Sequence, residues 1–216
     1  MRYILVISLI FIGFFQTKAQ DTINLINGSR LLVQMIDTNL TSLRYSFKKN
    51  EKLKIETIEK DEVFSVNYFN GKEVIVYAQD TLSEDSYMTI EEMRAYIAGE
   101  RDAVKGFKSP VTTITSAAFG VASGLVPLLL LSQSATLSLL SPIPPAAYVG
   151  ISGARWIKIS RNHVSNPKYL KSESYIEGYD HAARSKRIQN ALIAGGCGLL
   201  VGTIARFFLY SSVAKK

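Results

Sequence analysis

The sequence is poor in the residues that carry most catalytic and metal chemistry. It contains one cysteine, Cys197, so an intrachain disulfide is impossible and the chain must fold by packing alone. Its two histidines, His163 and His181, have no cysteine or carboxylate at metal-ligand spacing. The glycine-rich residues 195–198 lack the G-x-G-x-x-G spacing of a dinucleotide loop. We therefore expect no metal site, no cofactor-binding residues, no catalytic residues and no enzyme activity.

Charged residues are missing from two long segments, residues 111–153 and 190–205. About 20 apolar residues are enough to cross a bilayer. The segments therefore predict an integral membrane protein with a transmembrane hairpin at 111–154 and a transmembrane helix at 190–212, joined by a basic connecting segment with a helix at 155–189. In the alternative, the first segment makes one span followed by a proline-rich tail, which places the basic segment inside, as the positive-inside rule prefers.

The N-terminus has the layout of a secretory signal peptide. Arg2 supplies a positive start, residues 4–15 form an apolar run, and small residues precede a cleavage position after Ala19. The run is short for a membrane span, which argues against an uncleaved anchor helix. We expect residues 1–19 to be removed and the domain that follows to be exported to the periplasm. Helical spans favour the inner membrane, because outer-membrane proteins usually span as barrels.

Basic residues cluster beside the apolar segments, and the formal net charge is +7. This placement indicates contact with lipid headgroups. An exported chain rarely meets nucleic acid, so we expect the lipid bilayer as a partner and no nucleic acid. The clusters are Arg101, Lys105 and Lys108, then Arg155, Lys158 and Arg161, and finally Arg184, Lys186 and Arg187.

Residues 20–82 show the pattern of a small β domain. Two Asn-Gly pairs, at 27–28 and 70–71, each separate two apolar segments, which is typical of a tight hairpin turn. Between them apolar and polar residues alternate, for example at Leu53 and Ile55, which predicts one buried and one solvated face. Six short strands in so few residues would form a strongly bent sheet or a small barrel.

Small β domains of this kind bind other molecules more often than they catalyse reactions. The candidates for a binding face are one cation and three aromatic residues: Arg44, Tyr45, Tyr68 and Tyr77. Packing in the core of the domain explains the aromatic residues equally well, so both interpretations stay open.

An amphipathic surface helix is predicted at residues 89–108. Thr89 and Glu92 form a capping box at its start, and apolar residues then recur on one face at helical spacing. The helix leads directly into the first apolar segment, so it is expected to lie along the membrane surface.

A short motif occurs twice in the chain. Tyr96 and Gly99 are matched by Tyr175 and Gly178, and each copy precedes basic residues and a glycine-rich apolar segment. If both copies enter the membrane from the same side, the first and last spans run parallel and a return crossing is needed near 136–154. The motif therefore predicts three spans, whereas the charge rule favours two.

Each predicted span carries small residues four positions apart, which let helix backbones approach closely in lipid. We expect these residues to hold a tight bundle, within one chain or between copies. The helix-packing candidates are Gly120, Gly124, Gly150, Gly198 and Gly202.

Several motifs resemble a known group of proteins. They include NGSRL at 27–31, NGKE at 70–73, NPKY at 166–169 and YIEGY at 175–179. Together they resemble an uncharacterised family of exported Bacteroidota membrane proteins with an N-terminal small β module and glycine-rich C-terminal membrane helices. The resemblance covers most of the chain after the signal peptide and implies an exported membrane protein, without implying an activity.

The sequence thus predicts an α+β membrane protein with a small exported β domain, an amphipathic helix and two to three transmembrane helices. We expect a membrane-anchored envelope protein whose β domain serves as an interaction or scaffold module, with a protein partner or with self-association through the helices. The alternative is a homo-oligomeric channel or transport accessory built from the ridged helices, whose pore could use only Thr, Ser and Gln133.

Overall fold

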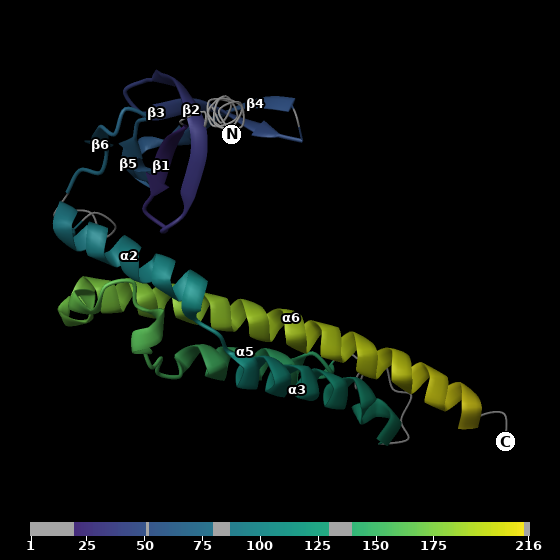
Figure 1. Cartoon of the computed structure of the whole chain (residues 1–216). Helices are drawn as coiled ribbons and strands as arrows, with labels where there is room; N and C mark the ends of the chain where they lie inside the picture. Colours follow the sequence, from purple (N-terminus) through teal and green to yellow (C-terminus); the bar gives the residue numbers. More distant parts are fainter. Residues whose placement is uncertain (1–19, 51, 80–86, 130–139, 214–216) are drawn as a thin grey trace, which may run out of the picture. The chain divides into compact units, whose positions relative to one another are not determined.

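The computed structural model divides the chain into two compact units, Met1–Ile90 and Glu91–Lys216 (Figure 1). The first unit holds a six-stranded antiparallel sheet and the second holds the long helices, so the chain is an α+β protein, as expected. The predicted signal peptide lies outside the described residues. The structure describes residues 20–50, 52–79, 87–129 and 140–213.

The sheet is built from strands that pair in an antiparallel arrangement, in the order β4-β3-β2-β1-β5-β6. The two predicted Asn-Gly turns connect β1 to β2 and β5 to β6, and their glycines Gly28 and Gly71 have φ angles of 76° and 82°. Glycine enters this region without a steric penalty, so both predicted hairpins form where the sequence placed them. The strands are β1 (Asp21–Leu25), β2 (Arg30–Thr38), β3 (Ser42–Lys49), β4 (Lys52–Glu59), β5 (Val63–Asn67) and β6 (Glu73–Ile75).

The described strands form an open sheet and not a closed barrel, because β4 and β6 stand at the two ends of the strand order. Register shifts occur between Asn24 and Leu25 in β1 and between Met35 and Asp37 in β2. Such β-bulges bend a strand and increase its twist. Of the two expected forms, the bent sheet is therefore the one that matches.

The core of the first unit is contributed by β1, β2, β3 and β5. Ile23, Val33 and Leu43 are at most 2% exposed. The polar groups that enter this core are paired: the side-chain amide of Asn24 donates to the Ser65 hydroxyl at 2.9 Å. A buried polar group with a partner avoids the cost of desolvation without a hydrogen bond.

Strand β4 departs from the expected pattern. Its alternation predicted a buried face for Leu53 and Ile55, but these side chains are 68% and 52% exposed. Within the described sheet, β4 pairs with β3 and lies beyond the core cluster at the edge. Ile55 pairs with Ser46 of β3, whereas Glu56 pairs with Tyr45 of the core cluster. Because neighbouring residues of a strand point to opposite faces, Leu53 and Ile55 lie on the face away from the core.

In the described part of the second unit, three helices pack along one long helix. α2 begins directly after Thr89, where the capping box predicts a helix start. α6 runs through the boundary expected at residue 190, so the helix of the basic segment and the last predicted span are one continuous helix. The helices are α2 (Ile90–Gly106), α3 (Pro110–Leu129), α5 (Ile143–Ala154) and α6 (Glu173–Val213), with 3-10 turns at Lys60–Glu62, Arg161–His163 and Pro167–Lys171.

The helix directions follow from the contacts along α6. Gly120 of α3 lies against Gly195, and Gly124, one turn later, lies against Gly202, so α3 and α6 run parallel. α5 runs in the opposite direction, because its start lies near Gly195 and its end near Ile188. This is the arrangement that the repeated motif predicted for the first segment, the return segment and the last helix.

Length and hydropathy identify one helix able to cross a bilayer, Glu173–Tyr210 within α6, in the described part of the chain. A second candidate arises if α2 and α3, which are bent by 62° at the break between them, are counted as one broken span. α5 has 12 residues. By these criteria the described residues give one span, or two if α2 and α3 form a broken span, whereas the sequence predicts two to three.

Candidate functional site

Glycines of α3 and α6 allow the two backbones to approach closely. A Cβ atom built on Gly120 would lie 2.2 Å from the carbonyl oxygen of Gly195, and one on Gly198 would lie 2.2 Å from that of Ala117. Real Cβ atoms essentially never show contacts under 3.0 Å, so only glycine allows these backbones to approach so closely. The contact is reciprocal, since each glycine meets the carbonyl three residues before the glycine of the other helix.

The same contact is repeated one turn further along both helices. A Cβ atom on Gly202 would lie 2.4 Å from the carbonyl oxygen of Val121, and one on Gly124 would lie 2.8 Å from that of Leu199. Four of the five glycines predicted to pack helices are thus at the crossing of α3 and α6. The crossing is formed within one chain.

Gly150 lies elsewhere. A Cβ atom at this position would meet nothing within 4 Å in the described structure, and the same is true of Gly196 in α6. α5 is rotated so that Val149 and Gly153 are among its buried positions, and Gly153 lies against the Ile188 side chain. The packing role predicted for Gly150 is therefore wrong within the described chain.

The repeated motif packs against itself. A Cβ atom on Gly99 of α2 would lie 2.2 Å from the carbonyl oxygen of Tyr175, and one on Gly178 of α6 would lie 2.2 Å from that of Tyr96. This is the reciprocal geometry of the α3–α6 crossing. The two copies of the motif are therefore the two halves of a second glycine crossing, between α2 and α6.

A buried acidic group lies beside this second crossing. The Asp102 carboxylate accepts a hydrogen bond from the Tyr175 hydroxyl at 2.7 Å and another from the backbone N–H of Ser165 at 2.8 Å. Burial, together with the neighbouring Asp102, raises the pKa of Tyr175 well above its usual range, so the hydroxyl remains a donor. Asp102 thereby ties the loop before α6 to the crossing.

Glu100 is a second buried acid, with 3% of the residue exposed. One of its oxygens, Oε1, lies 2.9 Å from Nδ1 of His181. Its other oxygen and the Tyr179 hydroxyl are buried without a hydrogen-bond partner in the described structure. Burial raises the pKa of Glu100, and the interaction with His181 acts in the opposite direction.

Basic side chains of α6 hold the ends of the other helices. Arg184 Nη1 donates to the Gly153 carbonyl at 3.0 Å, and Arg187 Nη1 donates to the Ser152 carbonyl at 3.1 Å, both near the end of α5. Lys186 donates at 2.6 Å to a carbonyl near the end of α2. Cations are favourable at helix C-termini, where carbonyl groups lack partners and the helix dipole is negative. We refer to Arg184, Lys186 and Arg187 as the basic collar.

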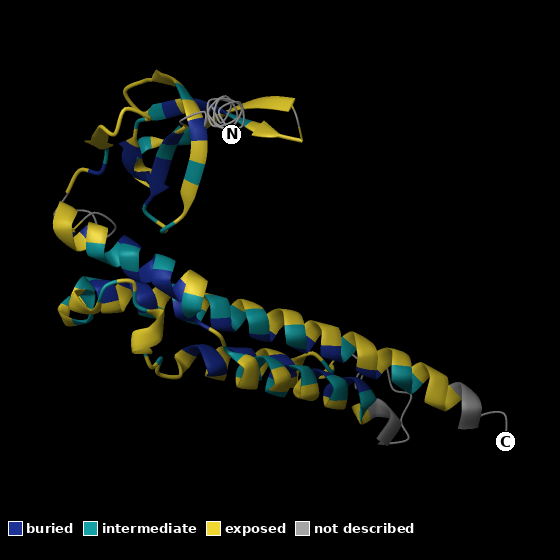
Figure 2. Ribbon diagram, viewed as in Figure 1, coloured by how far each residue is buried: buried dark blue, intermediate teal, exposed yellow. Residues whose placement is uncertain are grey.

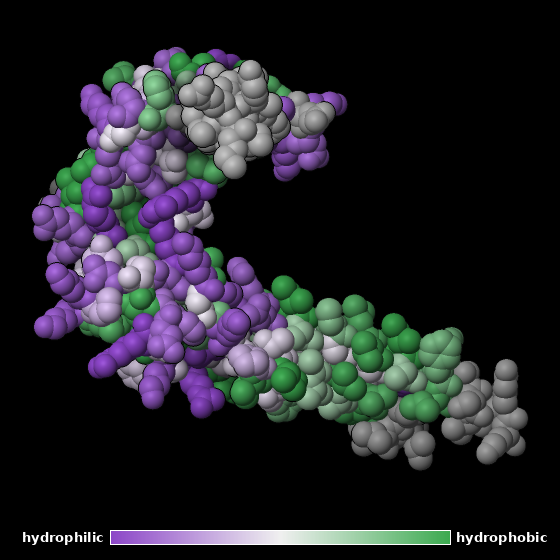
Figure 3. All heavy atoms as spheres, in the orientation of Figure 1, coloured by the Kyte–Doolittle hydropathy of each residue, from purple (hydrophilic) through white to green (hydrophobic). Residues whose placement is uncertain are grey.

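Beyond the basic collar, the surface of α3 and α6 is apolar. Figure 2 shows exposed positions along both helices, and Figure 3 shows that the surface over this end of the helical unit is hydrophobic. In the most apolar stretch of α6, 17% of the residues are buried, whereas the core helix of a soluble protein is mostly buried. The exposed side chains of these helices include Val111, Ile114, Phe119, Leu192, Ile193, Leu200, Val201, Ile204, Phe207 and Phe208.

The predicted binding face of the β domain is not assembled as expected. Tyr45 and Tyr77 are each 6% exposed, and the Tyr77 hydroxyl donates to the Met88 carbonyl at 2.8 Å. Tyr68 is partly buried against the core cluster. Arg44 is exposed. Core packing, the other interpretation left open above, therefore accounts for the aromatic residues.

The sequence did not identify Glu100, Asp102 and Arg187 as buried. The available signal was position on the helix: Asp102 follows Gly99 by three residues and therefore shares the face of α2 that meets α6. A charged residue on the packing face of a helix needs partners, and here these come from residues far apart in the sequence.

The described residues contain no group of three or more histidine, cysteine or acidic side chains placed to hold a metal ion. Comparison of the chain with protein-family models, with curated proteins and with solved structures finds no match. The resemblance to exported Bacteroidota membrane proteins therefore stays a prediction, and function has to be inferred from the geometry described above.

Proposed function

We propose that α3, α5 and α6 anchor the protein in the inner membrane and that the β domain is exported to the periplasm, where it serves as an interaction or scaffold module. The observation that carries the proposal is an apolar exterior on α3 and α6 around an interior of glycine contacts. A large exposed apolar surface marks an interaction with a membrane or a protein. In lipid, where hydrophobicity does not drive helices together, close backbone packing supplies the association.

The lengths of the helices support this anchor. α3 has 20 residues, and at the rise of an α-helix it is about 30 Å long, which is about the thickness of the hydrocarbon core. The charge-free part of α6, residues 190–205, packs along α3 and runs parallel to it. α5 is about 18 Å long and returns along α6.

The residues next to α5 support a membrane surface at the basic collar. Trp156, directly after α5, is 90% exposed. Arg155 and Lys158, on either side of it in the sequence, are both exposed. Tryptophan and basic side chains both favour the headgroup region of a bilayer. Arg184 and Lys186, the partly exposed members of the basic collar, and this segment would therefore contact headgroups, while the apolar parts of α3 and α6 contact the lipid tails.

Among the residues that the structure describes, which do not include Gln133, no observation favours the channel alternative. The Ser116 hydroxyl donates to the Ala191 carbonyl at 2.6 Å, and the Ser123 hydroxyl donates to the Phe119 carbonyl at 2.8 Å. These buried hydroxyl groups of α3 are used in contacts within the helix pair and do not line an open path. Their role is better explained by helix packing.

The test uses the single cysteine. Cys197 is exposed on α6 but lies within the proposed anchor, so a membrane-impermeant maleimide should not label it in intact membranes and should label it after denaturation. The matched control is Leu40→Cys combined with Cys197→Ser, because Leu40 is 96% exposed on the β domain. This cysteine should react from the periplasmic side.

Two results would contradict the anchor: release of the protein from membranes by alkaline carbonate, or labelling of Cys197 as fast as the control cysteine. The role as an interaction module has a separate test, purification in mild detergent. It predicts a stoichiometric partner, either another protein or a second copy of the chain, and a monomeric particle would count against it.

A further inference from the structure

Strand β4 presents the long open edge of the sheet. It pairs with β3 on one side and stands at one end of the described strand order, and seven of its eight residues are exposed. The strand at the opposite end, β6, has only three residues. An edge strand carries backbone N–H and C=O groups that can pair with another strand. β4 is therefore the place where the sheet can be extended by a partner.

The apolar residues of β4 are uncovered. Leu53 and Ile55 are 68% and 52% exposed, and because alternate residues of a strand share a face, they lie on the same side together with Thr57. Cross-strand pairs of such side chains stabilise a sheet. The apolar face that this alternation produces is therefore not covered by another part of the described chain.

The charges of β4 indicate which partner fits. The segment reads KLKIETI from 52 to 58, with basic residues before Ile55 and an acidic residue after it. If two copies pair antiparallel with Ile55 opposite Ile55, Lys54 of each copy lies opposite Glu56 of the other. Moving the centre by one residue in either direction would instead place two lysines or two glutamates opposite each other. The pattern is thus self-complementary in one register.

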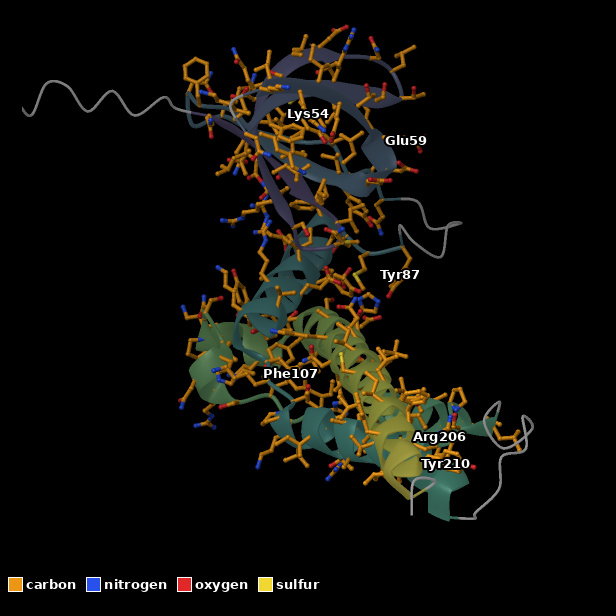
Figure 4. All side chains as sticks on the ribbon, turned by 90° about the vertical axis from the view of Figure 1, so that its right-hand side faces the viewer. Lys54, Glu59, Tyr87, Phe107, Arg206 and Tyr210 are labelled. Atoms are coloured by element: carbon orange, nitrogen blue, oxygen red, sulfur yellow. The ribbon has the colours of Figure 1, made fainter. Side chains whose placement is uncertain are left out.

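We propose that β4 pairs with β4 of a second copy of the chain, antiparallel and centred on Ile55, so that two six-stranded sheets join into one. Lys54 and Glu59 lie along this strand in Figure 4. The inference names the partner of the interaction module proposed above and rests on that proposal. A contact of one strand is small for a stable dimer in solution, and anchoring in one membrane raises the effective concentration of the two copies.

The first test is disulfide formation in isolated membranes, with Cys197 replaced by serine. The proposed register places the two residues 55 about 5 Å apart between Cβ atoms, so Ile55→Cys should form a covalent dimer under mild oxidation. Leu53→Cys is the matched control, because it shares the face and is at least as exposed. Its two copies would be about 13 Å apart along the strands, so it should remain monomeric.

The second test reverses the charges in the Ile55→Cys, Cys197→Ser background. Lys54→Glu places glutamate opposite glutamate twice, and Glu56→Lys does the same with lysines, so each should reduce the cross-linked fraction by about tenfold. The double variant Lys54→Glu, Glu56→Lys restores opposite charges and should recover cross-linking. Both residues are exposed, and Glu56 Oε2 accepts a hydrogen bond from the Tyr45 hydroxyl at 3.4 Å. Circular dichroism of the purified variants therefore has to match that of the parent before the cross-linked fractions are compared.

The outcomes separate this inference from the membrane anchor. If the chain stays in carbonate-washed membranes but Ile55→Cys does not cross-link, or cross-links no better than Leu53→Cys, pairing through β4 is refuted and the anchor stands. If the double charge variant fails to recover cross-linking, the proposed register is refuted. If carbonate releases the chain, the anchor fails on its own evidence.

Discussion

Replacing Gly198 with alanine adds one methyl group at the crossing of α3 and α6. The matched variant is Gly196→Ala, two residues earlier in the same helix. A Cβ atom at Gly198 would lie 2.2 Å from the Ala117 carbonyl oxygen, whereas one at Gly196 would meet nothing within 4 Å. The two variants therefore share the chemistry of the substitution and differ in what the methyl group contacts.

The magnitude follows from this distance. Ordinary van der Waals contact begins at 3.4 Å, so the Ala117 carbonyl and the new methyl group must separate by a little over 1 Å. A gap of about 1 Å removes up to about half of the dispersion energy of the contacts that it opens. Overpacking of this kind costs about 1–3 kcal/mol. The gain in helix propensity from glycine to alanine applies to both variants and cancels in their difference.

We therefore expect Gly198→Ala to unfold with a free energy about 1–3 kcal/mol lower than that of Gly196→Ala. The measurement is unfolding of the purified full chain by titration with SDS in mixed micelles, followed by the loss of helical circular dichroism. Gly196→Ala should be at least as stable as the parent protein, because alanine is the better helix former.

The reasoning is refuted if Gly198→Ala is as stable as Gly196→Ala, since the contact between α3 and α6 would then not be limited by the glycine. A loss of stability in Gly196→Ala of the same size would also contradict it. In that case the effect would belong to glycine in α6 generally and not to the crossing.

Two further predictions concern the buried acids. The raised pKa of Glu100 means that the folded state holds the proton of this carboxyl group to higher pH than the unfolded state, so Glu100 makes stability fall as pH rises through its folded pKa. Glu100→Gln should flatten that fall when the free energy of unfolding is measured from about pH 4 to about pH 8. An unchanged slope would argue against the raised pKa. Asp102→Ala leaves the buried Tyr175 hydroxyl and the Ser165 N–H without their acceptor and should lower the free energy of unfolding by about 1–3 kcal/mol. Asp102→Asn keeps an acceptor oxygen and should lower the free energy of unfolding by less. Equal losses in the two variants would count against the role of these hydrogen bonds.

Local patterns in the sequence were sufficient for much of the fold. The two Asn-Gly pairs determined where the hairpins turn, because Gly28 and Gly71 enter positive φ without strain. Asn27 and Asn70 keep negative φ, so neither turn is of type I′. Thr89 marked the start of α2, since its side chain can cap the first turn. The small residues at Gly120, Gly124, Gly198 and Gly202 were recognisable as helix contacts from their spacing alone.

Other features could not be read from local pattern. Leu53 and Ile55 alternate with polar residues as core strands do, yet β4 is an edge strand, and its position depends on pairings made elsewhere in the sheet. Tyr45 and Tyr77 could have been surface or core residues, and only packing in the folded domain decided between them. The rotation of α5 leaves Gly150 without a contact, and this rotation is set by the helices packed against α5 and not by the spacing of small residues within α5.

By itself the sequence determined which segments are strands and helices, where they turn, which segments are apolar enough for a membrane, and that a motif is repeated, because each of these depends on residues close together in the chain. Only the tertiary structure decided that the two copies of the motif cross each other, that Glu100 and Asp102 are buried beside that crossing, and that β4 is left with an open edge. These features arise from contacts between residues distant in sequence, and the energy of such contacts depends on the arrangement of whole elements.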